Sequence, residues 1–222
     1  MEVQETIKEI KKQFRLFMNG VVSQSMREKG LEYNINFGIE LPRLKVIAAK
    51  FEKNHDVAQA LWKENIRECK ILAGLLQPVE TFYPEIADIW VEDMHYPEIA
   101  DLTCMNLFQH LPYASEKAFQ WIADEGEYFQ YCGYMMLARL LMQGNEMNER
   151  AENELIDQAL AALQSEGALV CRGASTALRR YASQRKENSK KLLKLLGTQT
   201  DSDNASLIAL IEDIKLEAES LH

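Results

Sequence analysis

Apolar residues recur at helical spacing along almost the whole chain, and this pattern limits the folds that are open to it. Residues 3–18 carry Ile7, Ile10, Phe14 and Phe17 at intervals of three and four residues, as one face of a helix requires. The five prolines and ten glycines fall mostly between such segments. No alternating run of β-branched residues extends beyond four or five positions. The pattern therefore predicts an all-α protein.

The predicted helices come in pairs of roughly 30–40 residues, which is the repeat length of HEAT and armadillo units. They are expected at 3–18, from Pro42 onward, and at 56–64, 66–76, 82–92, 97–111, 115–124, 127–142, 149–164, 167–183, 188–196 and 203–219. Ser115 and Asn188 are predicted N-caps, and Gly197 is a predicted helix end. We therefore predict a right-handed HEAT-like superhelix, an α-α solenoid, as a single domain over 1–222, in which 197–222 forms a C-terminal capping helix.

One hexapeptide occurs twice, as Tyr83-Pro-Glu-Ile-Ala-Asp88 and as Tyr96-Pro-Glu-Ile-Ala-Asp101, 13 residues apart. Thirteen residues are too few for a helical hairpin repeat. Proline suits the first turn of a helix, and a following glutamate suits the positive end of the helix dipole. The two copies are therefore interpreted as two similar helix starts.

The formal net charge of −9 is unevenly distributed. Residues 1–70 carry 13 basic and 10 acidic side chains, residues 80–130 carry one basic and 11 acidic, and residues 172–194 carry eight basic and one acidic. Proteins that bind nucleic acid usually present a basic face, because cations neutralise phosphates and release counterions. Only the C-terminal segment fits that expectation.

The cysteines and histidines form no metal-binding pattern. Cys69, Cys104, Cys132 and Cys171 stand 35, 28 and 39 residues apart without a CxxC pair, and His55, His95, His110 and His222 are equally scattered. We expect no metal, no cofactor and buried, reduced thiols in a cytoplasmic protein. The N-terminus lacks the apolar core of a signal peptide. Apolar runs such as 134–142 are too short to cross a bilayer, so no membrane partner is expected.

Several short patterns, spread over about residues 30–195, carry a family resemblance. They are Asn36-Phe37-Gly38-Ile39, Pro42-x-Leu44-x-x-Ile47-Ala48, Ala60-Leu61-Trp62, Arg67-Glu68-x-Lys70-x-Leu72-Ala73 and the run from Val170 to Tyr181. Together they resemble the HEAT-repeat DNA alkylation-repair glycosylases, the AlkD-like family. The resemblance implies a bacterial protein that binds double-stranded DNA on the concave face of its solenoid.

The resemblance also implies a chemistry, the excision of cationic N3- or N7-alkylated purines by a DNA-3-methyladenine/7-methylguanine-type N-glycosylase, a hydrolase. A cationic base is already a good leaving group, so the enzyme mainly stabilises the oxocarbenium-like sugar. One carboxylate does this electrostatically, and aromatic rings flank the deoxyribose. The family segment that carries the carboxylate corresponds to Pro97–Asp101, which implies Asp101 as the catalytic residue.

The chain departs from the family pattern at three functional positions. Pro97 and Thr176 stand where the family has tryptophan, and no arginine occurs near Cys132 and Gly133, where the family has a central arginine. Three neighbouring tyrosines, Tyr96, Tyr131 and Tyr134, are candidates for a substitute aromatic lining. The losses favour a divergent member in which glycosylase activity is weak or lost.

The basic C-terminal segment supplies the candidate phosphate contacts, which are Arg172, Arg179, Arg180, Lys190, Lys191 and Lys194. Arg172 and Arg179 are two helical turns apart and can therefore share a face. An ordinary solvated helix pair that balances an acidic neighbour is the other interpretation of these charges. For the whole chain, the alternative to a DNA-binding repair protein is a non-catalytic HEAT-like scaffold with a protein partner, which the net negative charge favours.

Overall fold

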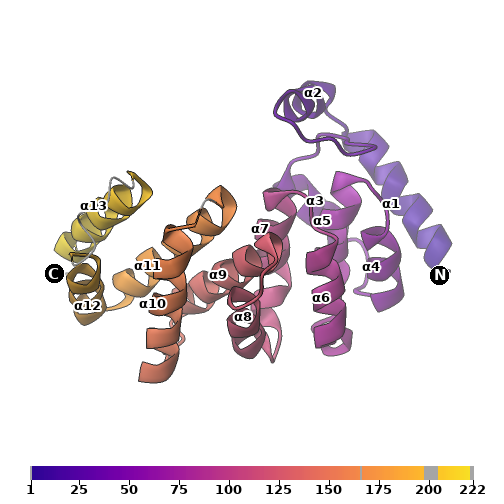
Figure 1. Cartoon of the computed structure of the whole chain (residues 1–222). Helices are drawn as coiled ribbons and strands as arrows, with labels where there is room; N and C mark the ends of the chain where they lie inside the picture. The colour runs from indigo at the N-terminus through magenta and orange to yellow at the C-terminus, as the bar shows by residue number, and fades with distance from the viewer. Residues whose placement is uncertain (1, 166, 198–204, 221–222) are drawn as a thin grey trace. The chain divides into compact units, whose positions relative to one another are not determined.

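The computed structural model describes residues 2–165, 167–197 and 205–220, apart from the side chains of 205, 206, 217, 218 and 220. Every regular element in these ranges is a helix (Figure 1). The chain forms two compact units, Met1–Pro112 and Tyr113–His222, and each is described separately below. The prediction of one continuous domain over 1–222 therefore stays a prediction. None of the helices in the described ranges is long and apolar enough to cross a membrane.

Unit 1 contains seven α-helices and two short 3₁₀ helices among its described residues. They are α1 (Val3–Phe17), α2 (Gly20–Glu28), α3 (Leu41–Ala48), α4 (His55–Trp62), α5 (Arg67–Leu76), η1 (Val79–Thr81), α6 (Pro84–Glu92), α7 (Pro97–Asn106) and η2 (Phe108–His110). Helix α4 packs against α5, while α5 packs against both α3 and α7. Trp62 of α4 stacks on Trp90 of α6, with ring centroids 3.9 Å apart and planes 4° from parallel.

Unit 2 consists of three helical pairs. Its helices are α8 (Ala114–Ile122), α9 (Glu127–Met142), α10 (Glu149–Leu163), α11 (Ala168–Gln184), α12 (Lys186–Gly197) and α13 (Ala205–Ser220). The pairs are α8 with α9, α10 with α11 and α12 with α13, and the second helices also pack in sequence, α9 on α11 and α11 on α13. This stacking of helical hairpins is the HEAT-like arrangement that the sequence predicts, so the all-α fold class is confirmed. The capping helix expected within 197–222 corresponds to α13, while 198–204 and 221–222 lie outside the described residues.

Two glycines allow α9 to pack closely on both sides. A Cβ at Gly133 would lie 2.8 Å from the carbonyl oxygen of Ala118 in α8. A Cβ at Gly173 in α11 would lie 3.0 Å from the Cδ2 atom of Tyr131 and 3.3 Å from the Cβ atom of Tyr134. A Cβ at Gly133 has no room, and one at Gly173 would press on Tyr131 and Tyr134, so these glycines let the helices pack closely over the residues between them.

Helix α2 is absent from the sequence-based prediction because it has almost no buried face. Ser23 is its one buried residue, and its start depends on Asn19, whose side chain accepts a hydrogen bond from the backbone N–H of Val22 at 3.2 Å. Gly38, at φ +68°, packs on this start, where an added Cβ would lie 2.3 Å from the carbonyl oxygen of Asn19. Local capping and one glycine contact, rather than amphipathicity, therefore define α2.

The predicted helix starts are confirmed in part. Pro84 and Pro97 occupy the first turns of α6 and α7, as the repeated hexapeptide predicts. The prediction of one helix over 97–111 is wrong, because α7 ends at Asn106 and η2 follows Leu107. The N-cap predictions at Ser115 and Asn188 are also wrong, because both residues lie inside helices. Asn188 instead donates a side-chain hydrogen bond to the carbonyl of Tyr181 at 3.0 Å.

The cysteines differ in burial, which leads to a testable difference in reactivity. Cys69, Cys104 and Cys132 are buried, whereas Cys171 is half-buried, and none of the four forms a disulfide. Burial raises the pKa of the Cys69 thiol to about 12. Because the thiolate is the nucleophile, its fraction at pH 8 falls about tenfold for each unit of that rise. We expect iodoacetamide to modify Cys171 first and Cys69 at least about tenfold more slowly, as measured by peptide mass spectrometry. Equal rates in the folded protein would contradict this.

Candidate nucleic-acid interface

Asp101, the candidate catalytic residue, lies in the second turn of α7. The helix begins at Pro97, directly after its N-cap Tyr96, so Asp101 is near the positive end of the helix dipole. Its side chain is half-buried, beside the buried Ala100. The Asp101 side chain therefore keeps partial contact with solvent.

A buried ionic cluster fixes the start of α7. Arg67, the first residue of α5, donates from Nε and Nη2 to the two carboxylate oxygens of Glu98 in α7, at 2.8 and 2.5 Å. Its Nη1 atom donates to Glu68 at 3.1 Å and to the carbonyl of Ile39 at 2.9 Å. Glu68 also accepts backbone N–H bonds from Phe37 and Ile39, at 3.1 and 3.2 Å. The cluster thus joins α5, α7 and the 34–40 segment.

Arg67 and Glu68 are almost completely removed from solvent, at 3% and 0% exposure. Burial lowers the pKa of Arg67, but the contacts with Glu98 and Glu68 outweigh it, so the pKa is raised overall. Bidentate pairing and backbone N–H donors satisfy these charges, as a buried ion pair needs. The sequence pattern used the two residues only as part of the family resemblance and predicted no structural role for them. The signal that could have identified them is an adjacent pair of opposite charges inside the apolar stretch 66–76.

The six predicted phosphate contacts do not form one face. Arg172 and Arg179 lie on the side of α11 opposite to its buried residues. The Arg172 guanidinium lies 5.0 Å from the ring centroid of Tyr131 and donates to its hydroxyl. Arg179 forms an ion pair with Asp213 of α13 at 3.0 Å. These two guanidinium groups therefore share the exposed face of α11, each held by a neighbouring helix.

The lysines of α12 point elsewhere. Lys190 and Lys194 are exposed on the side opposite to the buried residues of α12. Lys191 is bound to α10, where it contacts Glu152 at 3.2 Å and Asn153 at 3.0 Å. Lys191 therefore faces α10, whereas Lys190 and Lys194 lie on the exposed side of α12. Arg180 is exposed on α11 and lines a shallow depression with residues from 141–146 and 183–185.

Two of the three candidate tyrosines belong to the core. Tyr131 and Tyr134 are 0% and 1% exposed, because the close contact of α9 with α11 at Gly173 covers them. Burial raises the pKa of the Tyr134 hydroxyl. Neither ring offers a free face to a ligand, so the predicted aromatic lining is not formed by these two. Tyr96 is half-buried in unit 1, where its hydroxyl accepts the backbone N–H of Glu32 at 3.0 Å.

The acidic side chains of 80–130 lie mainly on α6, on α8 and in turns. The exposed ones are Glu80, Glu85, Glu92, Asp93, Glu116, Asp124, Glu125 and Glu127. On α7 the carboxylates are Glu98, which pairs with Arg67, and the half-buried Asp101. The acidic block therefore does not gather on the helix that carries Asp101. Within the described ranges, no group of three or more His, Cys, Asp or Glu side chains is arranged to hold a metal ion.

Comparison with known proteins identifies a family and a fold. The sequence model of the family described as DNA alkylation repair enzyme matches residues 5–206. A solved structure with a TM-score of 0.80 covers 99% of this chain and 95% of its own, at 16% identity. It is described as coming from a new family of proteins related to the HEAT-like repeat DNA glycosylases with affinity for branched DNA structures. At this identity the likeness concerns the fold. No curated protein matches the chain significantly.

Proposed function

The chain belongs to the DNA alkylation repair enzyme family, and from this premise we propose that it binds double-stranded DNA through the exposed face of α11. The observation that carries the proposal is the pair Arg172 and Arg179, two turns apart on that face. Tyr131 holds the Arg172 guanidinium in place, which limits the side-chain entropy lost when a phosphate binds. The ion pair of Arg179 with Asp213 is largely exposed and therefore weak, so a phosphate can replace Asp213 as the partner of Arg179. Arginine also matches phosphate geometry with two parallel donors.

Helix α11 is the second helix of its pair and packs between the second helices α9 and α13, and solenoids of stacked helical pairs bind their partners on an extended concave surface. Asp101 is the proposed carboxylate beside the sugar. Because Pro97 and Thr176 replace the family's tryptophans and the central arginine is missing, excision of cationic alkylated purines is weak or lost. Such a role agrees with the cytoplasmic location expected from the reduced thiols.

The test is the salt dependence of binding to a fluorescent 20-base-pair duplex, measured by anisotropy. Each neutralised phosphate contributes about −0.9 to the slope of log K against log salt concentration. Arg172→Gln/Arg179→Gln removes two contacts and should flatten the slope by about 1.8, that is 2 × 0.9. Lys190→Gln/Lys194→Gln is the matched control, because it removes the same charge from the outward side of α12. A four-way junction, measured in parallel, tests whether the chain shares the affinity for branched DNA described for the related structure.

Two outcomes would contradict the proposal. Absence of binding at about 50 mM salt, where electrostatic contacts are strong, would exclude DNA as a ligand. An unchanged slope for Arg172→Gln/Arg179→Gln would remove α11 as the contact face. Thermal denaturation of each variant controls for loss of the Arg172–Tyr131 contact.

The alternative function is a non-catalytic scaffold for a protein partner. The observation in its favour is the set of exposed carboxylates on the α8–α9 hairpin of unit 2, namely Glu116 in the first turn of α8, and Asp124, Glu125 and Glu127 around the turn that follows this helix. Carboxylates repel DNA but attract a basic protein surface. DNA binding that survives at physiological salt would count against this alternative.

A further inference from the structure

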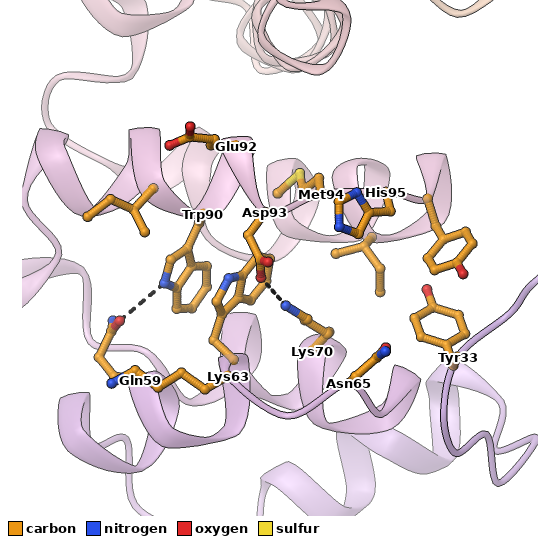
Figure 2. A pocket seen from close by; sticks show the side chains of 14 residues that line it. Tyr33, Gln59, Lys63, Asn65, Lys70, Trp90, Glu92, Asp93, Met94 and His95 are labelled. Carbon is orange, nitrogen blue, oxygen red and sulfur yellow. Dashed lines mark hydrogen bonds and ion pairs between the residues drawn. The ribbon is translucent and has the colours of Figure 1, made fainter.

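A pocket of about 580 Å³ opens in unit 1, between α4 and α5 on one side and α6 with the start of α7 on the other (Figure 2). This volume is within the range of small-molecule sites. Figure 2 shows two facing rows of side chains, with Gln59, Lys63 and Lys70 in one and Trp90 and Asp93 in the other. All lining residues belong to unit 1, whereas the proposed DNA contacts lie on α11.

Two buried donors that line this pocket have no hydrogen-bond partner among the described residues. They are the indole N–H of Trp62 and the hydroxyl of Tyr33, on side chains 3% and 8% exposed. The stacked neighbour of Trp62 is satisfied, because the Trp90 indole N–H donates to Gln59 at 3.2 Å. Buried donors are nearly always paired, so the acceptor of these two groups is a bound water or a ligand rather than a group of the chain.

The charges around the indole indicate what the acceptor is. The Lys70 ammonium lies 4.5 Å from the Trp62 ring centroid and is held by an ion pair with Asp93. Figure 2 shows Lys70 and Asp93 facing each other across the pocket. Lys63 lines the same pocket and has no ion-pair partner within the described ranges. A carboxylate that replaced Asp93 as the partner of Lys70 would lie beside the Trp62 ring, whose N–H has no acceptor within the described residues.

We propose that this pocket binds a small monocarboxylate with an apolar body. The carboxylate accepts from Trp62 and Lys70, and the body lies along Met94 and Ile99, which are 2% and 3% exposed. Tyr33 stands at the far end from Gln59 in Figure 2, where its hydroxyl donates to a second, neutral acceptor on the ligand. The rim carboxylates Glu92 and Asp93 repel a phosphate dianion more strongly than a singly charged carboxylate.

Calorimetric titration of the full chain tests the proposal with octanoate, 8-hydroxyoctanoate, octanamide and inorganic phosphate. Octanoate has about ten non-hydrogen atoms, and at the binding free energy per atom that is usual for small ligands its Kd should be on the order of 1 mM. Octanoate should bind at least about tenfold more tightly than octanamide, because the amide lacks the charge that Lys70 attracts.

Asp93→Asn should tighten octanoate binding about threefold or more, because it frees Lys70 from its internal partner. Trp62→Phe, which keeps an aromatic ring but removes the N–H, should weaken binding of both carboxylates about tenfold.

Tyr33→Phe provides the second variant and separates a binding role from a purely structural one. It should weaken binding of 8-hydroxyoctanoate and leave binding of octanoate unchanged, because only the former carries an acceptor for the hydroxyl. The folded protein should be no less stable, since the variant removes an unpaired buried hydroxyl. Absence of octanoate binding at 20 mM, about twenty times the expected Kd, would overturn the proposal. So would preferential binding of phosphate, or affinities that do not respond to Asp93→Asn and Trp62→Phe.

Discussion

Replacing Arg67 with methionine should lower the free energy of unfolding by about 3–5 kcal/mol. The substitution leaves Glu68, which is 0% exposed, as a buried carboxylate without its cation. It also breaks the bidentate contact with Glu98 and the bond to the carbonyl of Ile39. Removing one partner from a buried pair is far more harmful than removing both, because the remaining charge stays desolvated. Urea denaturation followed by circular dichroism measures the change.

A second variant tests whether Arg67→Met destabilises the protein through the unpaired charge of Glu68 or through lost packing. Arg67→Met/Glu68→Gln removes the stranded carboxylate as well, and Glu98 is exposed enough to be solvated. It should recover at least half of the lost stability. Lys12→Met is the control, because its ion pair with Glu9 is exposed and such pairs contribute about 0–1 kcal/mol. A loss of less than about 1 kcal/mol for Arg67→Met would show that the cluster does not hold α5 and α7 together.

The helices could be predicted from the sequence where one apolar face alone defines them. Helix α1 is an example, because Ile7, Ile10 and Phe14 are buried at the predicted spacing. Helix α2 could not be predicted, because the cap Asn19 and the distant Gly38 define it. The end of α7 at Asn106 could not be predicted either, because apolar residues continue into η2 at the same spacing.

The candidate site was harder to predict because its residues depend on contacts between helices. The seven-residue spacing of Arg172 and Arg179 places both on one face of α11. Whether Lys190 and Lys194 join that face depends on the orientation of α12, which no local pattern encodes. The burial of Tyr131 depends on Gly173, 42 positions further along the chain. Arg67 and Glu68 likewise find their partners at Ile39 and Glu98.

The Arg67 cluster also links stability to the proposed chemistry. Glu98 is three residues before Asp101 and almost one turn away on α7. The bidentate contact with Arg67 therefore fixes the start of the helix that carries the candidate carboxylate. The other copy of the hexapeptide lacks this anchor, because its Glu85 is exposed. Identical sequences thus form similar helix starts in different surroundings, and this difference provides a matched control for catalysis.

Asp101→Asn should reduce the release of 7-methylguanine from methylated duplex DNA by about 10²–10³-fold, which is typical for the loss of one electrostatic group in a preorganised site. Asparagine keeps the shape of the side chain but removes the negative charge that stabilises the oxocarbenium-like sugar. Release is measured by chromatography of the free base under single-turnover conditions, and duplex affinity should change little, because Asp101 acts on the transition state.

Asp88→Asn is the matched control for this experiment. Asp88 occupies the same place in α6 as Asp101 in α7, five residues into a helix that starts with the same Pro-Glu-Ile-Ala sequence, and it is also half-buried. Its replacement should leave the rate unchanged. Equal loss in both variants would indicate a general electrostatic or structural effect, and equal release by Asp101→Asn and the unaltered protein would remove Asp101 from the mechanism. Absence of release by the unaltered protein, together with salt-dependent binding, would instead indicate a family member that keeps the DNA contacts of α11 after losing catalysis.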